Sequence, residues 1–249
     1  NNRRGLDAML NGRSYSLYDQ AVGWVPRPGY KWELHNISRQ GLRGLREYPE
    51  TPPDPDKRIL CVGDSFTFGY DVIDTETYPW HAEQLRPGTE WINLGNCGTC
   101  LLQSLLHYRK TGKTFGGKYV VIGFMTNDGK RTVNCFRPFI SPDDPGTPFA
   151  KPFAKFSDGM FSIEPNPYQD ISDYRRLLAN ESTELERLRE LDYLTWSKQA
   201  APANPILRTL NYVSHSMDVD RNIDSLLARP ARRRGLSRDQ HAEPYGSAI

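Results

Sequence analysis

Three short apolar runs mark the central part of the chain. They lie at residues 58–63, 90–94 and 118–124, and each is bounded by charged residues or by glycine. Short continuous apolar runs of this kind are typical of strands that are buried on both faces. The pattern therefore predicts three core strands, of which 58–63 is the first.

The segments between these strands have helical spacing. Residues 77–85 begin with Thr77, a capping residue, and Pro79 is tolerated in the first helical turn. Residues 101–110 carry leucines at helical spacing, and Gly112 is placed to end the helix. Because parallel strands need crossover connections of about a dozen residues, the pattern predicts an α/β fold, a parallel sheet covered on both faces by helices.

The chain on either side of this pattern is less regular. Residues 1–57 are rich in proline and contain a basic stretch with glycines, so we interpret them as a loop-rich lead-in packed on a main domain at 58–249. Residues 134–170 are rich in proline, phenylalanine and tyrosine, which predicts an irregular excursion that forms the wall of a binding site. We interpret the whole of 134–235 as an irregular or helical insertion.

One helix is predicted within this insertion. Thr183 and Glu186 form a capping box ahead of leucines at helical spacing, so a helix is expected from there to about Trp196, with its leucine stripe in the core. No fourth strand is identified after residue 130.

Composition and charge exclude several classes of protein. Of the 249 residues, 37% are hydrophobic and 11% aromatic, which predicts a packed globule and not a disordered chain. The net charge of +2 does not favour a nucleic-acid partner, and the arginines at 229–234 are interpreted as a solvated loop. No apolar run approaches the roughly 20 residues that span a membrane, so the chain is expected to be soluble, without a membrane span.

The cysteines allow two further interpretations. Cys97 and Cys100 form a C-x-x-C pair, which suits a redox motif or half of a zinc site. Zinc would need two further ligands at suitable spacing, and no second pair of that kind exists. Buried thiols are therefore favoured, and no metal is expected.

A serine stands where the first strand ends. The motif Gly63-Asp-Ser-Phe-Thr-Phe-Gly69 follows that strand, and ligands bind outside the carboxyl ends of strands in open α/β sheets. Ser65 is thus a candidate nucleophile, with a simple helix-capping turn as the alternative. Asp64 is interpreted as structural, through hydrogen bonds to neighbouring amides. The motif resembles the first block of the SGNH (GDSL-type) hydrolases, serine esterases and acyltransferases with a flavodoxin-like sheet.

Two more blocks follow the next two strands. Asn93-Leu-Gly-Asn-Cys-Gly98 resembles the second block of the family, and Met125-Thr-Asn-Asp128 resembles the third, which normally reads Gly-x-Asn-Asp. The resemblance implies an oxyanion hole formed by the backbone N–H groups of Ser65 and Gly98 and by the side chain of Asn127. For the glycines of the second block, an ordinary strand-to-helix turn is the alternative.

A fourth block lies near the end of the chain. Arg238-Asp-Gln-His-Ala-Glu-Pro-Tyr-Gly246 resembles the last block of the family, which implies that His241 is the general base and that Asp239 orients it. The spacing is Asp-x-His where Asp-x-x-His is commoner, a variant found in enzymes resembling alginate O-acetyltransferases. His81 and His107 fall within predicted helices and receive no role.

The resemblance implies a function. Residues 19–43 also look like the lead-in of one bacterial branch of the family, so the chain is expected to be a serine hydrolase that cleaves acetyl or short-chain acyl esters through an acyl-enzyme, without a cofactor. The expected substrate is a saccharide or a small-molecule ester, and the resemblance favours an extracytoplasmic location. Two alternatives stay open, an O-acyltransferase acting on polysaccharide and a catalytically decayed binding module.

Overall fold

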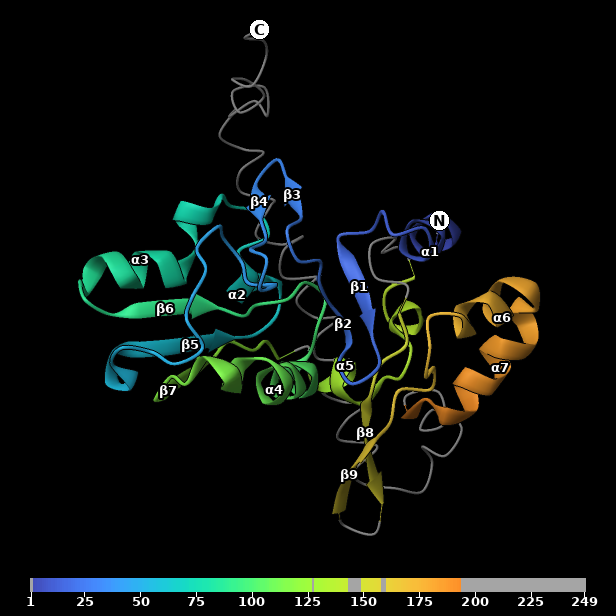
Figure 1. Ribbon diagram of the computed structural model, residues 1–249. Helices are drawn as coiled ribbons and strands as arrows, with labels where there is room; N and C mark the ends of the chain where they lie inside the picture. Colours follow the sequence, from blue (N-terminus) through green and yellow to red (C-terminus); the bar gives the residue numbers. More distant parts are fainter. Residues whose placement is uncertain (1, 127, 143–148, 158–159, 194–249) are drawn as a thin grey trace, which may run out of the picture. The chain divides into compact units, whose positions relative to one another are not determined.

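The structure is a computed structural model that describes residues 2–126, 128–142, 149–157 and 160–193 (Figure 1). The chain divides into two units, residues 1–199 and 200–249, and all of the described residues belong to the first. The lead-in at 1–57 therefore shares a unit with the sheet that follows it.

Three parallel strands form the central sheet. Strand β5 (Arg58–Val62) lies between β6 (Glu90–Asn93) and β7 (Tyr119–Ile122), so that Leu60 stands opposite Ile92 on one side and Val120 on the other (Figure 1). All five residues of β5 are buried. The three predicted strands are confirmed, and the protein is mixed α/β with a parallel sheet flanked by helices.

Strand β7 differs from the prediction in its exposure. Its four residues were expected to be buried on both faces, yet all four are exposed. Among the described residues, β7 pairs only with β5 and is an edge of the sheet. An apolar composition indicates that a strand favours burial, but it does not specify which neighbours cover the strand.

Helices α3 (Tyr78–Leu85) and α4 (Leu101–Lys110) confirm the two predicted crossover helices. The buried face of α4 is nevertheless more polar than its leucines predict, since Leu101 and Leu105 are exposed and Gln103 is fully buried. The reason is a tertiary contact, because the side-chain amide of Gln103 donates a hydrogen bond of 2.8 Å to the carbonyl of Val22 in the lead-in.

The lead-in folds as two small antiparallel hairpins that pack on the sheet's loops. Strand β1 (Ser16–Asp19) pairs with β2 (Gly23–Pro26), and β3 (Lys31–Trp32) pairs with β4 (His35–Asn36). Trp24 of β2 is fully buried, and its indole N–H donates to the carbonyl of Cys97 at 2.9 Å. This bond fixes the first hairpin against the loop that follows β6.

The segment at 134–170 is more regular than predicted. It contains an antiparallel hairpin of β8 (Phe153–Ser157) and β9 (Met160–Glu164), in which the ring centroids of the paired residues Phe156 and Phe161 lie 4.8 Å apart. Flanking prolines hid this hairpin in the sequence, because proline is depleted in strands. Aromatic cross-strand pairs stabilise hairpins, and this pair was the available signal.

Helix α7 (Glu181–Leu191) begins two residues before the predicted capping box at Thr183. The preceding helix α6 (Asp173–Ala179) ends at Ala179. Asn180 lies between the two helices and caps both, so Glu181 is the first residue of α7. Leu188 is fully buried, as the predicted leucine stripe requires, whereas Leu191 is exposed. The helix was predicted to continue to about Trp196, but it ends at Leu191, because the backbone of Asp192 is extended; residues 194–196 lie outside the described residues.

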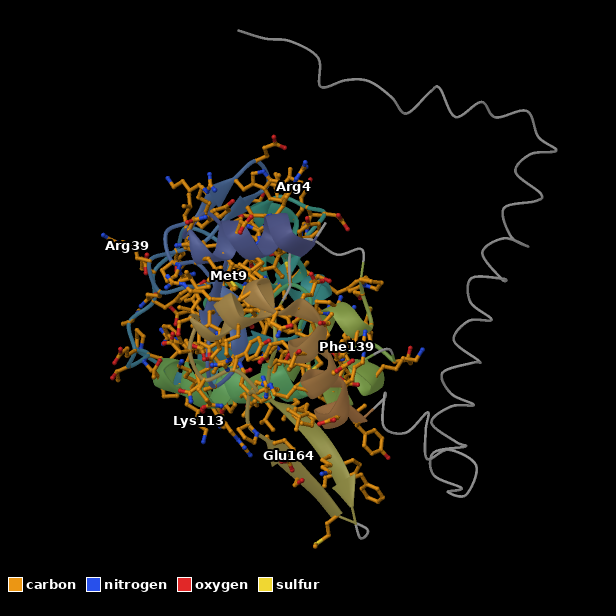
Figure 2. All side chains as sticks on the ribbon, turned by 90° about the vertical axis from the view of Figure 1, so that its right-hand side faces the viewer. Arg4, Met9, Arg39, Lys113, Phe139 and Glu164 are labelled. Atoms are coloured by element: carbon orange, nitrogen blue, oxygen red, sulfur yellow. The ribbon has the colours of Figure 1, made fainter. Side chains whose placement is uncertain are left out.

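Shorter elements connect these parts: α1 (Asn2–Leu10), η1 (Pro55–Lys57), α2 (Ser65–Phe68), η2 (Asp74–Glu76), η3 (Gly112–Phe115), α5 (Asp128–Val133) and η4 (Arg137–Phe139). One hydrophobic cluster joins α1 to Trp24 of β2 and to the segment after residue 134, with Met9 buried in it and Phe139 packed against it. Both side chains are labelled in Figure 2. A second cluster surrounds Leu60 and Ile92 of the sheet. Within the described ranges, no helix is long and apolar enough to cross a membrane.

A buried arginine fixes the amino end of the sheet. Arg58 is fully buried, and its guanidinium donates to Glu90 of β6 at 2.7 Å, to the carbonyl of Pro49 at 2.6 Å and to that of Phe115 at 2.7 Å. One side chain thereby holds β6, the lead-in and η3 around the start of β5. Loss of a partner in such a buried group leaves the remaining polar atoms unsatisfied.

We expect Arg58→Met to lower the free energy of unfolding by about 3 kcal/mol, because a carboxylate and two carbonyls lose their shared donor. Urea unfolding followed by tryptophan fluorescence measures this change. Lys57→Met is the matched control, since the Lys57 side chain is exposed and its ion pair with Asp54 lies at the surface; a change within about 0.5 kcal/mol is expected there. Equal stability of the two variants would contradict the role of Arg58.

Candidate active site

The candidate nucleophile lies at the carboxyl edge of the parallel sheet. The chain passes from β5 to β6 and then to β7 on the opposite side of β5, so the strand order reverses at β5. Ligands of open α/β sheets bind at such a reversal, outside the carboxyl ends of the strands. Ser65 follows β5 at that position and is the first residue of α2.

Asp64, and not Ser65, caps helix α2. The Asp64 carboxylate accepts a hydrogen bond of 2.9 Å from the backbone N–H of Phe66, and its side chain is buried. The structural interpretation of Asp64 is confirmed. The side chain of Ser65 is not needed for the cap, and Ser65 is half-buried.

Three glycines hold α2 in close contact with the sheet. Gly63, Gly95 and Gly123 each follow one of the three strands. A Cβ atom added at Gly63 or Gly123 would lie 2.2 or 2.3 Å from the hydroxyl of Thr67, and one added at Gly95 would lie 2.2 Å from the backbone nitrogen of Phe68. Only residues without a side chain allow the strand ends to approach α2 this closely.

Polar contacts join the β6 loop to α2 as well. The side-chain amide of Asn93 donates to the carbonyl of Thr67 at 2.8 Å, and its oxygen accepts from the N–H of Gly95 at 2.9 Å. The N–H of Asn96 donates to the carbonyl of Gly63 at 3.0 Å. These bonds fix the position of the loop that carries Gly98 relative to the loop that carries Ser65.

Ser65 and Gly98 line the same cavity. Its volume is about 400 Å³, and the two residues come from the loops after β5 and β6. Gly98 has a φ of 72°, which favours glycine at this turn. The structure thus brings together two of the residues that the sequence motifs single out. The other residues that line the cavity are Ser14, Tyr15, Ser16, Trp32, His35, Phe68, Tyr70, Cys97, Arg131 and Arg137.

The lead-in supplies five of the twelve residues that line the cavity. The sequence predicted that residues 134–170 form the wall, yet Arg137 is their only contribution among the described residues. Tyr15 and Trp32 of the lead-in, with Tyr70 after α2, supply the aromatic surface instead. Sequence distance conceals this arrangement, because the hairpins of the lead-in reach the site only through tertiary packing.

His35 is a cavity residue that sequence reasoning missed. The centroid of its ring lies 5.4 Å from that of the Trp32 ring and 5.3 Å from that of the Tyr70 ring. Its Nε2 is hydrogen-bonded to the backbone carbonyl of Tyr70. Burial lowers the pKa of His35, and the bond to that carbonyl opposes the shift. A neutral ring that donates from Nε2 supports the two aromatic side chains at the cavity mouth.

Tyr15 closes another part of the wall. Burial raises the pKa of its hydroxyl well above the usual value, and the neighbouring Cys97 acts in the same direction. Its ring packs edge-to-face on Phe68 at 5.6 Å. The Tyr15 hydroxyl is therefore a neutral group of the cavity wall at neutral pH.

Three predicted site residues lie outside the described residues: Asn127, Asp239 and His241. The residue after Asn127 is described, and it orders the third loop. The buried Asp128 carboxylate accepts a hydrogen bond of 3.2 Å from the N–H of Met125, while the N–H of Asp128 donates to the carbonyl of Met125 at 2.9 Å. The loop after β7 is closed on itself at that point.

The C-x-x-C pair forms no disulfide, and neither do the other two cysteines. Cys100 is buried at the start of α4, whereas Cys97 is half-buried and lines the cavity. Within the described part of the chain, no group of three or more histidine, cysteine, aspartate or glutamate side chains is arranged to hold a metal ion.

Comparison with known proteins finds no family model that matches the chain and no match among curated proteins. The four sequence motifs are therefore what supports the family resemblance.

We expect Gly95→Ala to destabilise the protein by about 1–3 kcal/mol, because the added methyl group would overlap the backbone of α2. Gly129→Ala is the matched control, since nothing lies within 4 Å of a Cβ atom added at Gly129 in helix α5. Alanine there should leave stability unchanged or raise it by up to about 1 kcal/mol. The midpoints of urea unfolding of both variants, compared with that of the wild type, test the difference. An unshifted midpoint for Gly95→Ala would show that the close contact between α2 and the loop after β6 is not required for stability.

Proposed function

We propose that the chain is a serine ester hydrolase of the SGNH type, with its sheet in the flavodoxin-like arrangement. The observation that carries the proposal is the meeting of Ser65 and Gly98 in one cavity at the carboxyl edge of the sheet. The strand order β6-β5-β7 supports it, because flavodoxin-like sheets begin with the order 2-1-3.

The proposed reaction proceeds in two steps. His241, oriented by Asp239, takes the proton of the Ser65 hydroxyl as that oxygen attacks the ester carbonyl. The N–H groups of Ser65 and Gly98 and the side chain of Asn127 donate to the resulting oxyanion, and His241 returns the proton to the leaving alcohol. Water then attacks the acyl-enzyme by the same route and releases the acid.

Size and lining of the cavity favour a short acyl group on a saccharide. A volume of about 400 Å³, closed by Tyr15 and Phe68, suits an acetyl group together with one sugar ring. Trp32 and Tyr70 are 49% and 45% exposed, and both line the cavity. The faces of such rings offer apolar surface to a sugar without the entropic cost of ordering long side chains.

An O-acyltransferase is the second candidate, favoured by the Asp-x-His spacing at Asp239 and His241. It would use the same acyl-enzyme and pass the acyl group to a sugar hydroxyl in place of water. Product analysis with and without an oligosaccharide acceptor separates the two, because only a transferase forms an acylated acceptor.

We expect Ser65→Ala and His241→Ala each to abolish covalent labelling by a fluorophosphonate and to lower turnover of p-nitrophenyl acetate by at least about 10³-fold. His35→Asn is the comparison variant, because His35 is the histidine that the structure places in the cavity wall. We expect it to keep labelling at a reduced rate.

Labelling that survives in His241→Ala and is lost in His35→Asn would assign the base to His35 instead. A wild-type protein that is neither labelled nor active would contradict the enzyme and favour a glycan-binding module.

We expect Trp32→Ala to raise KM for an O-acetylated disaccharide by about three- to ten-fold, because one stacking surface is lost. KM for ethyl acetate, which has no sugar to stack, should stay within two-fold in the same variant. Trp80→Ala is the matched control, since Trp80 is exposed on α3 and does not line the cavity. KM is measured from the release of acetate by the wild type, Trp32→Ala and Trp80→Ala. An equal rise in KM for both esters in Trp32→Ala would contradict a saccharide-binding surface.

A further inference from the structure

One guanidinium nitrogen touches all three loops at the carboxyl edge of the sheet. Nη1 of Arg131, on helix α5, lies 3.5 Å from a carboxylate oxygen of Asp64, 3.3 Å from the carbonyl oxygen of Thr99 and 3.6 Å from a carboxylate oxygen of Asp128. These residues follow β5, β6 and β7 in turn.

Each of these contacts is one residue away from a group in the proposed reaction. Asp64 precedes Ser65, Thr99 follows Gly98, and Asp128 follows Asn127. A shift of any one loop would therefore move the nucleophile relative to an oxyanion donor. Misplacement of reacting groups by about 1 Å lowers rates by as much as about 10²-fold.

Arg131 is also held through its backbone. The Arg131 side chain is 13% exposed, and its backbone carbonyl accepts a hydrogen bond from the ammonium of Lys151, a fully buried side chain that also binds the carbonyl of Asn134. Lys151 thus closes the carboxyl end of α5 (Asp128–Val133). The guanidinium is fixed at its backbone and at its tip, so little entropy remains to be lost when it orders the loops.

The positive charge of Arg131 also compensates two buried carboxylates. Asp64 and Asp128 are both buried, 2% and 3% exposed, and Arg131 contacts both carboxylates. Burial raises the pKa of Asp128, the charge of Asp64 acts in the same direction, and Arg131 and Arg137 oppose it. Lys151 donates to the backbone carbonyl of Arg131, and burial lowers the pKa of its side chain. Without Arg131, two buried carboxylates would face each other with weaker compensation.

We propose that Arg131 is a positioning residue, which holds the segments after β5, β6 and β7 in their mutual arrangement through a single guanidinium group that contacts Asp64, Thr99 and Asp128. This role rests on the proposed serine hydrolase. It acts through the loops and requires no contact between Arg131 and the substrate.

The test is a set of variants assayed with p-nitrophenyl acetate and a fluorophosphonate. We expect Arg131→Met to lower kcat by about 10- to 100-fold while KM changes by less than three-fold, because the reacting groups are misaligned while methionine keeps most of the aliphatic part of the side chain in the cavity wall. Arg176→Met is the matched control, since Arg176 pairs with Asp173 on the surface helix α6 and does not line the cavity.

A pH profile separates positioning from a merely structural role. Loss of Arg131 raises the pKa of the Asp128 carboxyl further. Below that pKa the carboxyl is neutral and the loops stay together, whereas above it the two carboxylates repel each other. The ratio of variant to wild-type kcat should therefore fall as the pH rises through that pKa. Asp128→Asn combined with Arg131→Met removes one of the two charges and should flatten this ratio, and Arg131→Lys should flatten it by restoring the positive charge.

The outcomes distinguish the two proposals. A wild-type protein without labelling or turnover overturns the serine hydrolase and the role of Arg131 with it. An active wild-type protein with an Arg131→Met variant within two-fold of it at every pH, or with a loss that is independent of pH and unchanged by Asp128→Asn, overturns the positioning role alone. Thermal unfolding checks the fold of each variant. If Arg131→Met does not fold, Arg131→Lys decides the question. A kcat about three- to ten-fold below that of the wild type supports the positioning role, because an ammonium group does not reproduce the three contacts of the guanidinium. A kcat equal to that of the wild type overturns it.

Discussion

The close approach between helix α2 and the ends of the three parallel strands is the constraint on which the candidate site depends. Gly63, Gly95 and Gly123 leave no room for a side chain beside Thr67 and Phe68. Parallel strands end at one edge of a sheet, so the three loops converge there whatever their sequences. The glycines convert that convergence into a fixed separation between the loop of Ser65 and its neighbours.

Buried polar side chains also hold the two ends of the sheet and the loops beside them in place. At the amino end of β5, the buried Arg58 holds β6 and the lead-in in place through three acceptors. At the carboxyl end, Asp64 caps α2 and Asp128 closes the loop after β7, and Arg131 contacts both. Buried charges of this kind are costly unless they are paired, so each arginine makes its neighbouring loops interdependent.

The lead-in completes the site from a distance in sequence. Its first hairpin is fixed by Trp24, which donates to the carbonyl next to Gly98, and its second hairpin brings Trp32 and His35 to the cavity. The cavity surface therefore comes in part from the lead-in before β5, while Ser65 and Gly98 come from the loops after the strands, the usual position of functional residues on a rigid scaffold.

The sequence by itself determined the strands, the crossover helices and the placement of Ser65 and Gly98 at strand ends, because hydrophobic periodicity and glycine preferences are local properties. It did not reveal the exposure of β7, the buried polar face of α4 or the hairpin that begins at Phe153, and it did not place Tyr15 and Trp32 of the lead-in in the cavity wall. Arg131 lies three residues after Asp128, a helical ion-pair spacing that could have been noticed, but its contacts with Asp64 and Thr99 could not. Only tertiary structure decides such features, since they depend on which distant segments pack together, and no local preference specifies that.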